Sequence, residues 1–135
     1  MQRILVGFDG SEGSENAVHK ATTLVDTGGE LVIIAVVPLP SDKNLVDQKT
    51  HEIMKKRAHS LIDIVVKDLS SRGFKITGIV EEGDIAAVII DIANNLQCDI
   101  IVLGSTGASK LGMYSIGSIA NKVVQYAYKP VMIVR

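Results

Sequence analysis

Hydrophobic and polar positions along the chain form two kinds of segment that follow one another strictly. Short apolar runs rich in Val, Ile and Leu are typical of strands. Longer segments with an apolar residue every three or four positions are typical of amphipathic helices. The pattern predicts the order β-α-β-α-β-α-β-α-β. The expected strands are residues 3–9 with their turn, 31–37, 74–80, 100–103 and 131–134.

Capping residues and glycines indicate where the helices begin and end. Ser11 or Ser14 can cap the first helix, which we expect to continue to Gly28-Gly29. Asp84 can cap the third helix, and the last begins near Ser118. In the second helix, His51 and His59 lack the i, i+4 spacing of a helical metal pair, so we expect no metal site there.

Strict alternation of strands and helices predicts an α/β fold. Its five-stranded parallel sheet has helices on both faces, in one domain over residues 1–135. Right-handed crossovers leave few arrangements, and the doubly wound choice is the order 3-2-1-4-5. The winding then reverses between strands 1 and 4, and ligands bind at the carboxyl ends of the strands at such a point.

The segment 104–118, GSTGASKLGMYSIGS, lies between the fourth strand and the last helix. Glycines let several backbone N–H groups approach one anion, and the helix adds its own unpaired N–H groups. This composition predicts a phosphate-binding loop, although an ordinary glycine-rich turn without a ligand is an open alternative. It is not a P-loop, because Met113 replaces the required lysine, and the chain has no GxGxxG fingerprint.

The spacing Gly104-x2-Gly107-x9-Gly117-Ser118 resembles the nucleotide-binding signature of the universal stress protein family. The likeness extends through ILVGFDGSE (4–12), EEGD (81–84), CDIIVLGSTG (98–107) and KPVMIVR (129–135). The resemblance implies an adenine nucleotide alpha hydrolase-like fold with strand order 3-2-1-4-5. It also implies that ATP, or AMP or ADP, binds with Mg²⁺ on the phosphates rather than in a protein cage.

The resemblance also implies a set of binding residues. Asp9 and the backbone of Gly7 would contact the adenosine portion, and the backbone of Val36 would meet the base edge. Main-chain N–H groups of the glycine loop would wrap ribose and phosphates. Two alternatives stay open: Asp9 as a turn carboxylate bonding its own backbone, and Val36 as plain core packing. The expected site residues are Gly7, Asp9, Val36, Gly104, Gly107, Ser109, Gly117, Ser118 and Ile119.

Two positions depart from the family pattern at the phosphate end. Nucleotide-binding members often carry a basic or imidazole side chain where Thr106 stands and a hydroxyl where Ala120 stands. These changes remove a cation and a hydrogen-bond donor. Ser109 and Lys110 lie in the same loop and could replace them.

Composition and charge exclude several partners. Among 135 residues, 14 are Lys or Arg and 15 are Asp or Glu, and no basic stripe with aromatics predicts nucleic-acid binding. No apolar run approaches the roughly 20 residues that span a bilayer. Strand-like residues begin so early that we expect no signal peptide and a cytoplasmic protein. Cys98 is alone, so we expect a buried thiol without an intrachain disulfide.

The preferred function is a stress-response protein that binds adenine nucleotide and is not an enzyme. The chain offers no positioned base, arginine finger or metal-holding acid pair, so an ATPase would be slow. A dimeric interaction module that needs no nucleotide is the other alternative. The last strand, Val131–Val134, is apolar and at the sheet edge, so we expect a homodimer that pairs through it, as the resemblance also implies.

Overall fold

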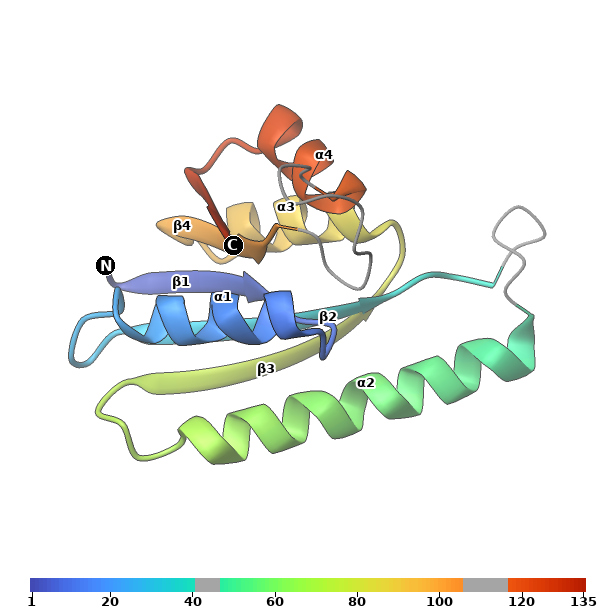
Figure 1. The fold of residues 1–135 in the computed structure, drawn as a ribbon, viewed down its shortest axis with the longest axis horizontal. Helices are drawn as coiled ribbons and strands as arrows, with labels where there is room; N and C mark the ends of the chain where they lie inside the picture. Colours follow the sequence, from blue (N-terminus) through green and yellow to red (C-terminus); the bar gives the residue numbers. More distant parts are fainter. Residues whose placement is uncertain (41–46, 106–116) are drawn as a thin grey trace.

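The computed structural model of the chain describes residues 1–40, 47–105 and 117–135. It contains a five-stranded parallel sheet in the order β3-β2-β1-β4-β5, which confirms the predicted fold class (Figure 1). The strands are β1 (Arg3–Gly7), β2 (Glu30–Val37), β3 (Lys75–Glu82), β4 (Ile100–Gly104) and β5 (Val131–Val134). The helices are α1 (Glu12–Thr22), α2 (Gln48–Leu69), α3 (Ile85–Asn95) and α4 (Ser118–Tyr126).

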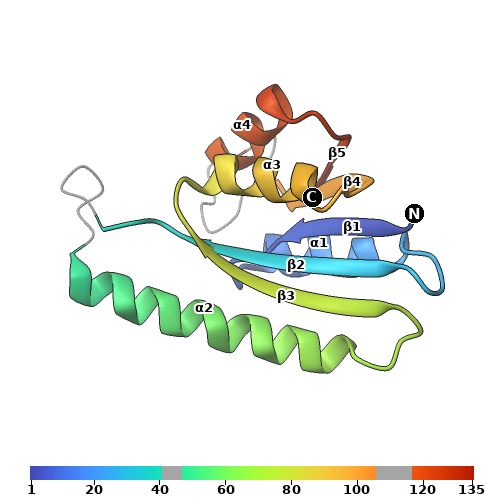
Figure 2. The ribbon, with the colours of Figure 1, turned by 180° about the vertical axis from the view of Figure 1, so that it is seen from behind.

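The helices cover both faces of the sheet, so the protein has two apolar cores. Helix α1 lies in front of the strands in Figure 1 and behind them in Figure 2. Ile4 and Val6 of β1 pack toward α1 and α2, whereas Leu5 between them packs toward α3 and α4. All three side chains are fully buried, as expected where successive residues of a strand point to opposite faces that are both covered.

Helix α1 ends earlier than predicted. It stops at Thr22, whereas the sequence pattern predicted an end at Gly28-Gly29. The hydroxyls of Thr22 and Thr23 each donate, over 2.6 Å, to a backbone carbonyl three residues earlier, and such side chains compete with the helical bonding pattern. Leu24 still packs against the core. The apolar stripe of this segment therefore extends past Thr22, the last residue of α1.

Strand β1 is the strand at which the order of strand addition reverses: β2 and β3 lie on one side of it, and β4 and β5 lie on the other. It pairs with β2 on one side and with β4 on the other, in parallel register on both. The turns that leave β1 and β4 consequently start at the same edge of the sheet. We name this row of strand ends the carboxyl edge and the opposite row the amino edge. The term edge strand is kept for the outer strands of the sheet, β3 and β5.

Candidate functional site

The turns after β1 and β4 meet at the carboxyl edge through a close contact between two glycines. A Cβ atom on Gly104 would lie 2.6 Å from the carbonyl carbon and oxygen of Gly13 in α1. On Gly7 it would lie 2.6 Å from a terminal methyl of Leu103. Packing therefore requires glycine at Gly104, where the Gly13 backbone occupies the space of a side chain, whereas at Gly7 only the flexible end of Leu103 would have to move.

Asp9 lies in a tight turn immediately after β1. Its Oδ1 accepts a hydrogen bond from the Ser11 N–H over 2.9 Å, which is the local turn bond that the sequence left as an alternative. The Ser14 hydroxyl, on a residue only 5% exposed, accepts from the Asp9 N–H and donates to the Ser11 carbonyl. Asp9 itself is exposed, so its turn bond does not close it off from solvent.

The hydrogen bonds of this turn favour the charged form of Asp9. Burial acts to raise the pKa of the carboxyl, but hydrogen bonds from Ser11 and Ser14 outweigh burial and lower the pKa below its ordinary value. Asp9 is consequently an anion at neutral pH that can accept further hydrogen bonds. That chemistry suits the hydroxyls of a sugar.

Val36 lies near the end of β2, and its half-buried side chain packs against the core shared by α3 and α4. Just beyond it, the carbonyl of Pro38 lies 2.9 Å from Nδ1 of His51 in α2. The sequence argument considered His51 only as a metal ligand and missed this contact. A usable signal was present, because His51 continues the buried stripe of Ala58 and Ile62 backward at helical spacing.

The start of α4 differs from the starts of the other described helices. Side-chain oxygens cap α1, α2 and α3, and they belong to Ser11, Asp47 and Asp84. The N-cap of α4 is Gly117, which has no side chain to offer, while its N–H donates to the Ser105 carbonyl. This bond brings the end of β4 close to the start of α4, and in the described part of the chain no side chain caps the first N–H groups of that helix.

Of the two residues that follow Gly117, Ser118 is exposed and Ile119 is half-buried against the α3 side of the sheet. Ala120 is only 4% exposed in the same core, so a larger polar side chain there would have to compete with packing. The expected site residues Gly107 and Ser109, together with Thr106 and Lys110, lie outside the described residues.

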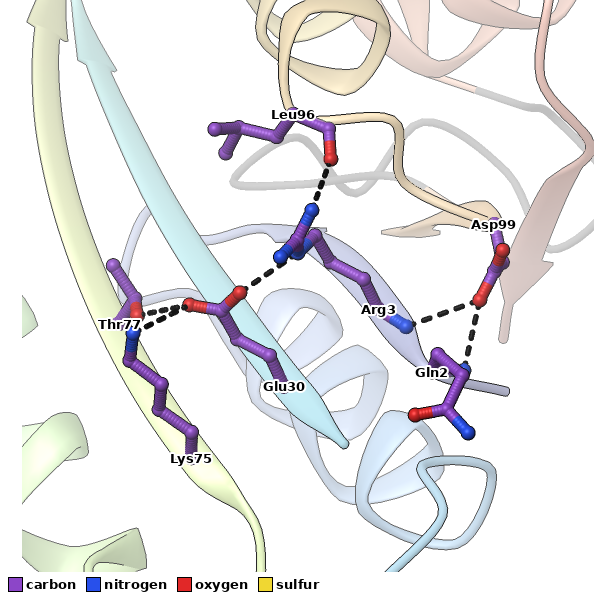
Figure 3. A network of polar contacts seen from close by, with 7 residues as sticks. All are labelled: Gln2, Arg3, Glu30, Lys75, Thr77, Leu96 and Asp99. Carbon is purple, nitrogen blue, oxygen red and sulfur yellow. Dashed lines mark hydrogen bonds and ion pairs between the residues drawn. The ribbon is translucent and has the colours of Figure 1, made fainter. Parts of the chain in front are cut away.

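A shallow cleft of about 340 Å³ lies at the amino edge, away from the predicted site. Its charged side chains bond to one another or to backbone: Glu30 accepts from Arg3, and Asp99 accepts from two N–H groups (Figure 3). Groups already paired in this way offer little to a charged ligand, so the cleft is the weaker candidate. It is lined by Gln2, Arg3, Gly28, Gly29, Glu30, Lys75, Gln97 and Asp99.

The described residues contain no group of three or more His, Cys, Asp or Glu side chains placed to hold a metal ion. Within the same ranges, none of the helices combines the length and apolarity that crossing a membrane requires.

This architecture is the adenine nucleotide alpha hydrolase-like fold, which solved structures similar to the chain share. The universal stress protein MJ0577 of Methanocaldococcus jannaschii superposes with a TM-score of 0.86 at 25% identity, covering 98% of this chain and 94% of that one. The family model of the universal stress protein family matches residues 1–135, and the chain belongs to this family.

Curated relatives agree with this assignment. The chain is 29% identical to universal stress protein MJ0531 of M. jannaschii, over 99% of this chain and 82% of that protein. It is 30% identical to universal stress protein YxiE of Bacillus subtilis, over 98% of each.

Two structures with bound nucleotides share the fold. A universal stress protein in complex with cAMP has a TM-score of 0.68 at 20% identity, covering 99% of this chain and 97% of that one. A family member from Arabidopsis thaliana with AMP bound has a TM-score of 0.69 at 15% identity, covering 99% and 91%.

Proposed function

We propose that this chain is a cytoplasmic stress-response protein that binds ATP or a related adenine nucleotide at the carboxyl edge. The nucleotide acts as a regulatory ligand and is hydrolysed little or not at all. Asp9 and the backbones of Gly7 and Val36 contact the adenosine portion. The segment from Gly104 to Ile119, including Gly107, Ser109, Gly117 and Ser118, surrounds the phosphates, which carry a Mg²⁺ ion.

The observation that carries this proposal is the start of α4. Its N–H groups lack a side-chain cap, and Gly117 lies within hydrogen-bond distance of Ser105 at the end of β4. A helix start of this kind attracts a phosphate because the N–H groups and the helix dipole both favour negative charge. The AMP-bound and cAMP-bound relatives support an adenine nucleotide as the ligand.

Thermal unfolding in the presence of MgATP tests the proposal. A ligand that binds only the folded state at about 100 times its Kd raises the free energy of unfolding by about 2.7 kcal/mol. We therefore expect a melting temperature several degrees higher in millimolar MgATP. An unchanged melting temperature would contradict nucleotide binding.

Substitutions of Gly117 separate binding from folding. Gly117 has a φ of −59°, which other residues adopt readily, so Gly117→Asp supplies the missing helix cap. It also places a carboxylate where the phosphates are expected. We predict that Gly117→Asp keeps or raises the melting temperature of the free protein and abolishes the MgATP shift. Gly117→Ser is the matched control, since it caps the helix without charge and should retain part of the shift.

The glycine loop has its own test. Gly107→Val should abolish the MgATP shift, because a β-branched side chain blocks close approach of the phosphates. Full-strength binding by this variant would mean that the loop is wrongly assigned.

Hydrolysis is expected to be negligible. A turnover of about 1 s⁻¹ or more, within the usual range of enzymes, would overturn the non-enzyme proposal. Release of inorganic phosphate from MgATP by the purified protein measures this directly, with Gly117→Asp as the background control.

We also propose that the chain forms a homodimer through β5, which is an edge strand. The carbonyls of Pro130 and Val134 accept bonds from β4, so by strand alternation the backbone of Ile133 faces the open edge. An unpaired apolar edge is a liability that a second copy would remove. In the segment that precedes β5 in the chain, Tyr126 is 67% exposed and Tyr128 is 86% exposed.

Ile133→Pro tests the dimer, because proline removes the outward-facing donor and leaves the β4 ladder in place. We expect this variant to sediment as one chain and the wild type as two. Met132→Pro is the control: its N–H faces β4 by the same alternation, so it should lower the free energy of unfolding instead. A wild type that is monomeric at micromolar concentration would contradict the dimer.

A further inference from the structure

Two polar side chains are buried in the described part of the chain, and both support a turn at the carboxyl edge. Ser14 and His51 are each 5% exposed. Ser14 bonds the backbone of the turn after β1, close to it in sequence. His51 reaches from α2 to the Pro38 carbonyl, just past the end of β2. Burying a polar group is costly unless it is bonded, so each contact constrains its turn.

Both ring nitrogens of His51 face acceptors. Nδ1 lies 2.9 Å from the Pro38 carbonyl oxygen, which can only accept, so Nδ1 carries the proton in this contact. Nε2 lies 3.4 Å from Oε1 of Glu82 at the end of β3. A neutral imidazole has one N–H and can donate to only one of these partners, whereas the charged ring can donate to both.

The groups around the ring keep this competition in place. The same Glu82 oxygen lies 2.7 Å from Nζ of Lys55. The hydrogen bond from Lys55 is the main reason that the pKa of Glu82 lies below its usual value, so Glu82 remains an acceptor at neutral pH. Among the described residues, the groups that face the ring or its partner are thus the uncharged Pro38 carbonyl just past β2, Glu82 from β3 and Lys55 from α2.

We propose that His51 is a positioning residue for the end of β2, and that its contact with the Pro38 carbonyl strengthens nucleotide binding. The ring lies between the Pro38 carbonyl and Glu82 and so fixes the strand end that carries Val36. This inference rests on the proposed function, because Val36 is the residue through which β2 contacts the base.

Two substitutions divide the two contacts of His51. In His51→Asn the amide N–H takes the place of Nδ1–H and can still donate to the Pro38 carbonyl. In His51→Gln the longer amide reaches toward Glu82 and leaves Pro38 without its donor. The matched controls are His59→Asn and His59→Gln, because His59 is exposed on the same helix.

Calorimetric titration with MgATP is the experiment. We expect His51→Gln to bind about three- to tenfold more weakly than wild type, whereas His59→Gln binds as wild type does. His51→Asn keeps a donor for the Pro38 carbonyl, so it should retain most of the wild-type affinity, as His59→Asn does.

A second readout needs no nucleotide. The Gly83 N–H donates to the Val37 carbonyl over 3.0 Å and reports on the end of β2. Its amide hydrogen exchange should be faster in His51→Gln than in wild type, and unchanged in His51→Asn and in His59→Gln. Exchange that is equal in all four proteins would overturn the positioning role even if wild type bound no nucleotide.

The possible failures are distinguishable. If wild type binds MgATP and His51→Gln binds it equally well, the inference is wrong and the proposed function stands. If wild type shows no binding at millimolar MgATP, the proposed function is wrong and so is the coupling to nucleotide. Should His51→Gln not fold, His51→Asn still decides the matter, because a loss of affinity or faster Gly83 exchange in that variant would contradict the inference.

Discussion

Polar side chains at the amino edge and at the carboxyl edge find their hydrogen-bond partners in different ways. At the amino edge, charged side chains pair with one another: Glu30 accepts from Arg3 over 2.7 Å and from the Thr77 hydroxyl, and lies 3.8 Å from Nζ of Lys75 (Figure 3). Glu30 keeps only 16% of its side chain exposed in this arrangement. Donors and acceptors there satisfy each other.

At the carboxyl edge, Glu82 pairs with Lys55, but the buried polar side chains bond to the backbone of the turns. Ser14 holds the turn after β1, His51 holds the end of β2, and Gly104 allows the backbone of Gly13 to lie directly against β4. The positions of these turns are thereby fixed while Asp9 and the start of α4 remain able to bond to a ligand. The difference agrees with the proposed function, in which the nucleotide binds at the carboxyl edge.

The largest expected effect concerns the glycine contact. Gly104→Ala should lower the free energy of unfolding by about 3 kcal/mol, because the new Cβ would collide with the Gly13 backbone, which cannot move aside. Gly7→Ala is the matched comparison, since its Cβ would meet only the flexible end of Leu103, and we expect about 1 kcal/mol. Urea denaturation measures both, and equal losses would argue against a tight backbone contact.

At the amino edge, Glu30→Ala should cost about 2 kcal/mol, because it leaves Arg3 and Thr77 without their shared acceptor. Glu81→Ala is the control, since Glu81 is an exposed carboxylate at the other end of the sheet, and the change should stay within about 0.5 kcal/mol. Comparable losses in the two variants would remove the distinction between the edges.

The contribution of Glu30 should also depend on pH. Burial acts to raise its pKa, but hydrogen bonds from Thr77 and Arg3, with the charges of Arg3 and Lys75, lower it below the ordinary value of 4.5. A lowered folded-state pKa adds stability above the unfolded-state pKa, and this is lost as pH falls through the folded-state value. The stability difference between wild type and Glu30→Ala should therefore shrink between about pH 7 and about pH 3.

A smaller effect is expected at Gly73, near the amino edge. It has a φ of +88° and no atom lies within 4 Å of a Cβ built there, so only its backbone conformation demands glycine. Gly73→Ala should cost about 1 kcal/mol, and Gly73→Asn less, because Asn tolerates positive φ. A loss at Gly73 as large as that at Gly104 would mean that conformation, not contact, decides both positions.

The smallest expected effect concerns the reactivity of the Cys98 thiol. Cys98, next to Asp99 at the amino edge, is 1% exposed, and burial raises its pKa to about 11. At about pH 8 a thiol reagent should leave the folded protein unmodified and react fully after denaturation. Rapid labelling of the folded protein would show that the amino edge opens.

Much of the fold follows from local pattern in the sequence. Strand and helix order, the Asp84 cap and the burial of Cys98 are confirmed by the structure. The end of α1 was wrong, because an apolar stripe marks which residues meet the core and not whether they remain helical. The site was predicted only as a set of residues, and the resemblance supplied their roles, which stay proposals.

The sequence by itself determined the elements, because periodicity, caps and glycines act within a few residues of one another. It also limited the strand order to a few arrangements, because crossovers are right-handed, and the family resemblance favoured the order 3-2-1-4-5. Only the tertiary structure decided that Gly104 meets Gly13 and that His51 lies between Pro38 and Glu82. These groups are distant in the chain and are brought together by packing of the helices on the sheet, which no local pattern encodes.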